Sequence, residues 1–175
     1  MFPMKKLLII CGISFAGKST LARALTERFH YPEVDVDEVK YELYGSAIQD
    51  EELRPEDWER TYAETDQRIE HYLQAGKSVV DASRYFTKQE RELARRIAMS
   101  QNAELVTIFV DTPKAVAQQR LLANRENPAR RNVTDADFAA ILEAMEPPTA
   151  DEQPLVLPYG EQIEHWIARN ISALS

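Results

Sequence analysis

A run of eight residues has the types and spacing of a loop that binds phosphate. Gly12 to Ser19 reads Gly-Ile-Ser-Phe-Ala-Gly-Lys-Ser, which matches G-x-x-x-x-G-K-[ST] at every fixed position. In such loops the glycines turn backbone N–H groups onto phosphate oxygens, the lysine reaches the β- and γ-phosphates, and the last hydroxyl binds Mg²⁺. The pattern predicts that ATP contacts Gly12, Ser14, Ala16, Gly17, Lys18, Ser19 and Thr20, that Ser19 is a Mg²⁺ ligand, and that Lys18 also acts in catalysis.

The flanking sequence supplies the elements that this loop needs. Residues 5–11 form a short apolar run that predicts a buried parallel strand ending at the loop. Residues 20–29 place Leu21, Leu25 and Phe29 on one helical face, so a helix follows the loop and adds its positive dipole end. A glycine-containing loop that matched by chance would not be expected to have both neighbours.

Acidic residues follow two further predicted strands. Residues 31–37 alternate apolar and acidic residues and predict a short strand that ends in Asp35 and Asp37. Asp37 is the predicted base for an acceptor hydroxyl, and Asp35 is its rival. Residues 78–81 predict a strand ending in Asp81, which would order the Mg²⁺ water shell. The alternatives are that Asp35 and Asp37 are solvated acids and that Asp81 caps a turn.

Arginines gather on and after a predicted helix that begins at Thr112-Pro113, with Thr112 as its N-cap. Forked guanidinium groups bind two phosphate oxygens at once, which suits a lid that closes over a nucleotide. The lid is predicted over residues 120–133, with Arg120 contacting the nucleotide and Arg125 and Arg130 acting in catalysis. Arg131 is a further candidate. The alternative is an ordinary solvated helix end.

The rest of the chain alternates predicted helices with predicted strands. The spacing of Trp58, Tyr62, Ile69 and Leu73 predicts an amphipathic helix whose apolar stripe is core, and residues 46–57 are polar enough to be a mobile substrate flap. Further strands are predicted at 105–110 and 155–157, and further helices at 38–44, 87–100, 112–122, 134–145 and 163–174. This alternation predicts an α/β fold with a parallel sheet covered on both faces and ligands at the carboxyl ends of its strands.

Composition bounds the class of protein. A chain of 175 residues with a formal net charge of −8 predicts one domain over residues 1–175 and disfavours non-specific binding of nucleic acid. Cys11 is the only cysteine, so no disulfide can form within the chain, and the three histidines are too scattered for a zinc site. No apolar run is long enough to span a bilayer. We expect a cytoplasmic monomer or homodimer with no leader segment and no membrane partner.

Several of these motifs, in their order along the chain, resemble the polynucleotide 5′-kinase-like branch of P-loop kinases, an AAA-type ATP-binding domain. The shared features are the loop, Asp37 with Lys40, Asp81-Ala82-Ser83, the arginine lid, and a helix ending at Met145-Glu146-Pro147-Pro148. The zeta-toxin and chloramphenicol phosphotransferase families are similar but more distant. The resemblance implies a three-layer P-loop NTPase fold, a five-stranded parallel sheet of order 2-3-1-4-5, and transfer of the ATP γ-phosphate to a hydroxyl.

The resemblance also implies roles for residues around the acceptor. Asp37 matches the catalytic base, and Lys40 stands where that family has an arginine that contacts the substrate. Residues 81–84 match a motif that usually reads Asp-Ala-Thr-Asn, so Arg84 replaces an amide with a cation and suggests an anionic acceptor. The residues expected to bind the acceptor are Asp35, Lys40, Ser83 and Arg84.

Three functions stay open on the sequence. The leading hypothesis is a kinase, with ATP and Mg²⁺, that acts on a hydroxyl of a small polar or anionic molecule. A polynucleotide or RNA 5′-hydroxyl kinase is the enzyme alternative, which the acidic balance disfavours. A non-kinase ATP-dependent switch is the alternative from another class. A GTPase is disfavoured because the sequence has no Asn-Lys-x-Asp motif.

Overall fold

The computed structural model describes residues 4–131 and 133–175, so residues 1–3 of the predicted domain and Asn132 of the predicted lid lie outside it. Its strands form one parallel sheet with the order β2-β3-β1-β4-β5, which confirms the predicted order. The strands are β1 (Lys6–Cys11), β2 (Glu33–Val34), β3 (Val79–Asp81), β4 (Glu104–Asp111) and β5 (Leu155–Pro158).

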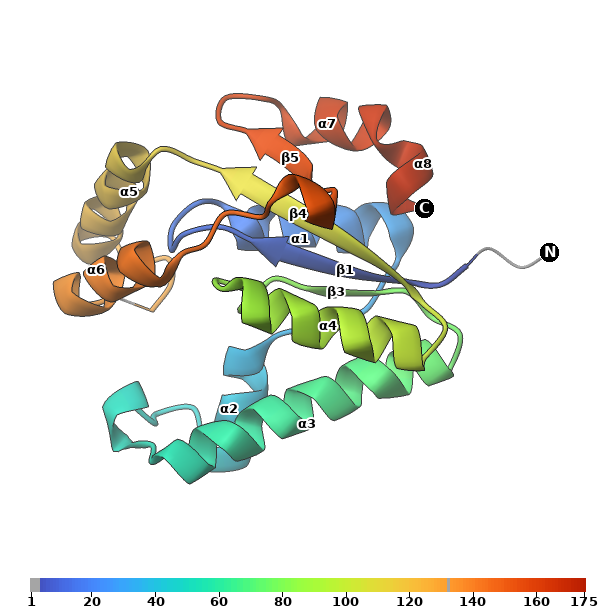
Figure 1. The fold of residues 1–175 in the computed structure, drawn as a ribbon. Helices are drawn as coiled ribbons and strands as arrows, with labels where there is room; N and C mark the ends of the chain where they lie inside the picture. The colour runs from blue at the N-terminus through green and yellow to red at the C-terminus, as the bar shows by residue number, and fades with distance from the viewer. Residues whose placement is uncertain (1–3, 132) are drawn as a thin grey trace.

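Helices cover both faces of the sheet, as a three-layer α/β fold requires (Figure 1). One face carries α1 (Lys18–Phe29), α7 (Ile163–Arg169) and α8 (Ile171–Leu174), and the other carries α3 (Pro55–Gln74) and α4 (Lys88–Ser100). The remaining elements are α2 (Val36–Tyr44), η1 (Asp50–Glu52), α5 (Lys114–Glu126), α6 (Asp135–Ala144) and η2 (Ala150–Glu152). None of the described helices is both long and apolar enough to cross a membrane.

Strand β1 lies at the centre of the core, and its side chains alternate between the two faces. Leu8 and Ile10 pack in the cluster with α1 and α7, whereas Leu7, Ile9 and Cys11 pack in the cluster with α3 and α4. All five are fully buried, and the Cys11 thiol donates to the carbonyl of Ile108 at 3.2 Å. The loop that follows Cys11 therefore starts from the fully buried centre of the sheet.

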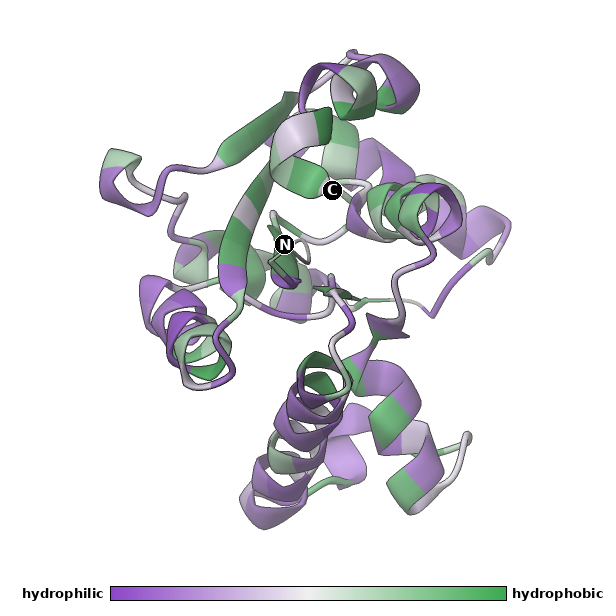
Figure 2. Ribbon diagram, turned by 90° about the vertical axis from the view of Figure 1, so that its right-hand side faces the viewer, coloured by the Kyte–Doolittle hydropathy of each residue, from purple (hydrophilic) through white to green (hydrophobic). Residues whose placement is uncertain are grey.

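The strands all end at the same edge of the sheet, which is the edge next to α5 and α6 in Figure 1. The turns after β1 and β3, Asp50 of η1 and the segment after β5 line a cleft at this edge. Figure 2 shows the strands largely hydrophobic and α3 largely hydrophilic over its length, in keeping with a helix that packs on the sheet along one stripe.

The predicted second strand is wrong in its extent. Pairing stops at Val34, and α2 begins at Val36, so Asp37 lies in the first turn of a helix and not at the end of a strand. Asp35 is the N-cap of α2, and its carboxylate accepts a hydrogen bond from the Asp37 N–H at 2.7 Å. The preference of aspartate for an N-cap outweighs the alternating pattern that predicted a longer strand.

Two other predicted boundaries also differ. Thr112 does not cap α5, because Pro113 is the N-cap and the Thr112 hydroxyl donates to the Ala16 carbonyl at 2.8 Å. The predicted closing helix is divided at Asn170 into α7 and α8. In contrast, the predicted caps at Thr87 and Thr134 are confirmed by hydrogen bonds from the N3 amides of their helices.

Candidate functional site

The predicted phosphate loop has a backbone that only glycine suits at two positions. Gly12 and Gly17 have φ of 147° and 108°, and a Cβ built on Gly12 would lie 2.9 Å from the carbonyl oxygen of Val110. Helix α1 begins at Lys18, and its backbone hydrogen bonds start with Thr20 and Leu21, which donate to the Gly17 carbonyl at 3.1 Å, so the N–H groups of Lys18 and Ser19 precede these bonds. A concave loop at a helix N-terminus is a fitting cradle for phosphate oxygens.

The Lys18 side chain is folded back across this loop. Its ammonium donates to the carbonyl oxygens of Gly12 at 2.8 Å and Ile13 at 3.0 Å. Burial, together with the nearby positive charge of Arg130, lowers the pKa of Lys18 to about 8. The ammonium therefore lies where the β- and γ-phosphates are expected and is held by weak acceptors that an anion can replace.

A cleft of about 920 Å³ opens beside the loop. It brings together most of the residues predicted from the sequence: Ser14, Ala16, Gly17, Lys18, Ser19, Thr20, Asp35, Asp37, Ser83, Arg120 and Arg130. Five predicted residues do not line it: Gly12, Lys40, Asp81, Arg84 and Arg125.

The lid arginines divide into two groups. Arg120 donates to the carbonyls of Phe15 at 3.0 Å and Ala16 at 2.9 Å, and the Arg130 guanidinium lies 4.5 Å from the centre of the Phe15 ring. Both arginines therefore lie against the phosphate loop. Arg125 instead donates to Val133 O at 3.1 Å and to the Asp135 carboxylate at 2.7 Å, and it does not line the cleft.

Lys40 has a different position from the one that the resemblance implied. Its side chain has no exposed surface, and its ammonium donates to the carboxylates of Asp37 at 2.7 Å and Asp50 at 2.8 Å. Burial acts against the charge, but these two hydrogen bonds outweigh it and raise the pKa of Lys40. Lys40 thus positions two carboxylates that line the cleft and has no surface of its own for a substrate.

The polar side chains of the Asp81-Ala82-Ser83-Arg84 motif form hydrogen bonds and ion pairs with one another and with neighbouring residues. Asp81 is fully buried, and its oxygens accept hydrogen bonds from the Ser83 N–H, the Ser83 hydroxyl and the Tyr85 hydroxyl, at 2.6–2.9 Å. Arg84 pairs with Asp66 and lies 3.5 Å from Asp81. Asp81 therefore does not face the cleft, and Arg84 does not offer the free cation on which the anionic acceptor was predicted.

The site suits a Mg²⁺ ion that takes most of its ligands from the nucleotide phosphates and water and few from the protein. No cluster of His, Cys, Asp or Glu among residues 4–131 and 133–175 is arranged to hold a metal by itself. Ser19 is exposed at the start of α1, and Asp35 lines the cleft nearby. Burial raises the pKa of Asp35, while the hydrogen bond from Asp37 N–H acts against this shift. Mg²⁺ usually takes few protein ligands and completes its shell with phosphates and water, which Ser19 would allow.

Several residues of the cleft were missed by sequence reasoning. Trp58 and Tyr62 were predicted to be core, but only Ile69 and Leu73 of that stripe are fully buried, and both rings line the cleft. Asp50 lies in the predicted flap, where no single residue stood out. Tyr159 and its neighbours after β5 also line the cleft, and nothing in their sequence marked them.

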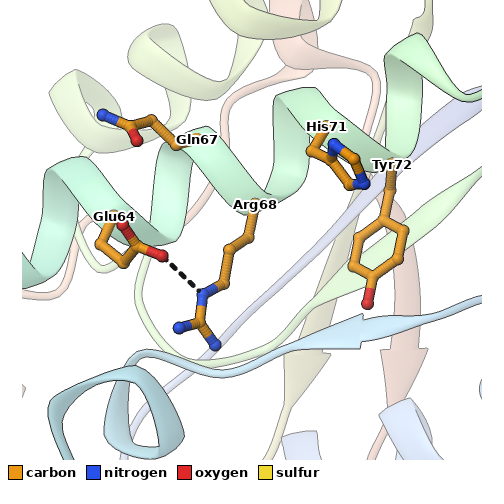
Figure 3. Close-up of a pocket in the computed structure, with 5 residues that line it drawn as sticks. All are labelled: Glu64, Gln67, Arg68, His71 and Tyr72. Carbon is orange, nitrogen blue, oxygen red and sulfur yellow. Dashed lines mark hydrogen bonds and ion pairs between the residues drawn. The ribbon is translucent and has the colours of Figure 1, made fainter. Parts of the chain in front are cut away.

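A second hollow of about 380 Å³ lies against α3 (Figure 3). It is lined by Glu64, Gln67, Arg68, His71 and Tyr72, and the Arg68 guanidinium pairs with Glu64 at 3.0 Å. It shares no residue with the cleft and contains none of the predicted site residues.

Comparison with known proteins places the chain in a family. A family model described as an AAA domain matches residues 7–148, which include the phosphate loop, the acidic residues of the cleft and the lid segment. The chain belongs to the AAA domain family. The expected P-loop kinase fold is thereby confirmed at the level of family and topology. No curated protein sequence matches this AAA-domain chain significantly.

Solved structures with the same fold include proteins described as kinases. A putative kinase from Chloroflexus aurantiacus J-10-fl aligns with a TM-score of 0.75 at 18% identity, over 98% of this chain and 99% of that one. A gluconokinase from Sinorhizobium meliloti 1021 aligns with a TM-score of 0.64 at 17% identity, over 98% of this chain and 92% of that one. The Mycobacterium tuberculosis APS kinase CysC, solved with AMPPNP and APS, aligns at 0.64 and 19%, over 99% and 98%. At these identities the similarity establishes the fold alone.

Proposed function

We propose that this AAA-domain protein is an ATP-dependent phosphotransferase that moves the γ-phosphate of ATP to a hydroxyl of a small polar molecule. One observation carries the proposal: a single cleft joins the phosphate loop, the lid arginines Arg120 and Arg130, and the carboxylate of Asp37. A kinase needs a carboxylate for the acceptor in the same cleft as the phosphate loop, and this arrangement supplies one. The similar solved structures that are described as kinases support this assignment.

Each group has a part in the proposed reaction. The loop from Gly12 to Ser19 holds the phosphates, and Mg²⁺, held by Ser19, would neutralise phosphate charge. The acceptor oxygen forms a bond to the γ-phosphorus as the bond to the β,γ-bridging oxygen breaks, and ADP leaves. Asp37 takes the hydroxyl proton, while Lys18 and Arg130 stabilise the charge that moves onto the bridging oxygen.

The proposal extends to features that neither the fold nor the family decides. We treat residues 1–175 as one cytoplasmic kinase domain, monomeric or homodimeric, with a lid over residues 120–133. Arg125 then acts by holding the lid through Val133 and Asp135 and does not touch phosphate itself. Asp35 and Ser83 line the acceptor side of the cleft and are the proposed acceptor contacts that remain from the sequence prediction.

Acceptor-dependent release of ADP tests the proposal. The purified protein, with ATP and Mg²⁺, is screened against sugars, nucleosides, amino alcohols and 5′-hydroxyl oligonucleotides. A kinase releases ADP slowly alone and rapidly with its acceptor, and Lys18→Ala abolishes this rise. A polynucleotide kinase would respond to the oligonucleotides alone. A protein that binds ATP tightly but releases no ADP with any acceptor would contradict the proposal in favour of a switch.

A further inference from the structure

Part of the lining of the cleft is acidic and aromatic. Asp37 and Asp50 contribute carboxylates with about half of each side chain exposed, at 54% and 50%. Trp58 and Tyr62 from the first turns of α3 form the neighbouring wall, with stacked rings 5.8 Å apart. We refer to these four residues and Asp35 as the acceptor wall.

Three cations beside the acceptor wall, Lys40, Arg84 and Arg131, are already paired. Lys40 is buried beneath it with both of its carboxylate partners in place. Arg131 donates to Asp50 at 3.0 Å and to Gln49 at 3.0 Å, and Arg84 is paired with Asp66. The wall therefore presents three carboxylates against two cations that are already bonded to them, Lys40 and Arg131, which leaves a negative balance facing the cleft.

The pKa of Asp35 agrees with a negative electrostatic potential at the acceptor wall. The pKa of Asp35 is raised by burial, and the charges of Asp37, Asp81 and Glu38 raise it further. The same field that disfavours a carboxylate at this place favours a positive charge brought by a ligand. Asp37 and Asp50 would repel an anionic acceptor, because the cations that contact them, Lys40 and Arg131, are already bonded to them. Arg23 also lines the cleft, and its charge acts on Glu33.

We propose that the acceptor is a hydroxyl compound that carries an amine and presents an apolar ring or chain face, with the amine at the acceptor wall. The apolar face packs on the rings of Trp58 and Tyr62. The amine is recognised and is not phosphorylated. This inference rests on the proposed function and replaces the anionic acceptor that Arg84 had suggested.

Two sets of matched compounds test the charge preference. Glucosamine, glucose and glucuronate share one ring and differ in charge, as do tyramine, tyrosol and 4-hydroxyphenylacetate on an aromatic scaffold. Binding is followed in the presence of AMPPNP by the fluorescence of Trp58. The chain has two tryptophans, and Trp166 is fully buried, so loss of the signal in Trp58→Phe assigns it to the acceptor wall.

We expect the amine of each set that binds to do so about tenfold more tightly than its neutral partner, with the acid weakest. Asp50→Asn should bring the amine-to-neutral affinity ratio close to one. A merely structural loosening of the flap would weaken both compounds and leave the ratio unchanged. Glu51→Gln, which removes the same charge from the next residue without lining the cleft, is the control and should keep the ratio.

The inference is overturned if an acid binds best in either set, or if neither amine changes Trp58 fluorescence up to about 10 mM. Its failure differs from failure of the proposed function. If the protein phosphorylates glucuronate in preference to glucosamine, the proposed kinase activity stands and the proposed amine-bearing acceptor is wrong. If an amine binds tightly but no acceptor in the wider screen is phosphorylated, the preference for an amine stands and the proposed kinase activity is wrong.

Discussion

Lys18 links the protonation of one side chain to the binding of nucleotide. Its pKa of about 8 means that the ammonium is present at neutral pH and is lost as the pH rises through 8. Because the charged form binds phosphate, the Kd for ATP should rise about tenfold between pH 7 and pH 9. Isothermal titration across this range measures it, and Lys18→Met should bind weakly with no such slope. A flat profile for the parent protein would contradict the expected role of Lys18.

Asp37 separates a kinase from a nucleotide switch. Asp37→Asn keeps the shape and an oxygen for Lys40 but loses basicity, so single-turnover transfer to the acceptor should fall about 10²-fold or more. ATP affinity should barely change, because Asp37 is expected to touch only the acceptor. Positioning carries part of the loss, since loose phosphoryl transfer depends less on a base than acyl transfer does.

Asp35→Asn is the matched control for Asp37. Its main contact is the cap of α2, and Asn is an equally good cap, so transfer should fall much less. A larger loss at Asp35 than at Asp37 would move the base to Asp35. No loss at either position would remove the proposed base and leave nucleotide binding untouched.

Single residues could be predicted from the sequence where their contacts are local. Gly12, Lys18 and Ser19 lie within one eight-residue loop, so local spacing alone could predict that they lie close together. Lys40 and Arg84 were assigned to the acceptor, but their partners include Asp50 and Asp66, ten and eighteen residues away along the chain. Such long-range pairing leaves no trace in local spacing.

The lid segment contains arginines with different expected effects. Arg130→Ala should lower kcat about tenfold or more while ATP affinity changes little, because its charge lies against the phosphate loop. Arg125→Ala should have the smaller effect, since Arg125 holds Val133 and Asp135 and does not line the cleft. Steady-state kinetics of both variants measure this. Equal kcat in Arg130→Ala and the parent would make Arg130 an ordinary solvated residue.

A buried ion pair joins α4 to η2. Arg91 and Glu152 are each 1% exposed and share two hydrogen bonds, at 2.6 and 3.1 Å. Arg91→Ala would leave the Glu152 carboxylate buried and unpaired, which should cost about 3–5 kcal/mol in the free energy of unfolding. Urea denaturation measures the loss.

The control for this pair is the exposed one beside it. Lys88 and Asp151 join the same two elements at the surface, and Lys88→Ala should change the urea midpoint little. The double variant Arg91→Met, Glu152→Leu should recover much of the stability, because it removes both charges. Equal effects of Arg91→Ala and Lys88→Ala would show that burial of the pair does not matter.

Helices begin where the sequence predicts them to begin wherever the capping residue and the hydrophobic periodicity agree. Thr87 and Thr134 marked helix starts correctly because a capping side chain bonds a backbone amide three residues away. At Asp35 the two signals conflicted: the alternating pattern predicted a strand, while aspartate is a good cap. The cap determined the structure, since β2 is an edge strand with only two paired residues.

The cleft is a property of the whole molecule, since its walls come from segments between Ser14 and Ile163. A ligand that bridges them binds the folded chain alone, so ATP at about 100 times its Kd should add about 2.7 kcal/mol to the free energy of unfolding. For a chain of this size the melting temperature should rise by about 5–10 °C. Thermal unfolding with and without ATP and Mg²⁺ measures the shift.

Lys18→Ala serves as the control for this stabilisation. Its melting temperature without nucleotide should be close to that of the parent, and ATP should leave it nearly unchanged. An equal rise in both proteins would mean that ATP binds elsewhere.

The arrangement of the whole sheet could be predicted because each strand alternates with a helix, and short right-handed connections allow few topologies. The set of residues that line the cleft could not be predicted from the sequence. Trp58 and Tyr62 follow the same periodic stripe as Ile69 and Leu73, and only the bend of the chain through α2 and η1 decides which end of that stripe is covered. Periodicity indicates a face of a helix, but not how far along the helix its neighbours extend.

The position of Cys11 gives the protein a built-in chemical reporter. Its thiol is fully buried in β1, donates to Ile108 O, and has a pKa that burial raises to about 11. Thiol reagents attack the thiolate, so the folded chain should resist alkylation and oxidation while an opened chain reacts. As the only cysteine, it makes the labelling rate of the unmodified protein a direct clock for opening of the central strand, at the residue immediately before the phosphate loop.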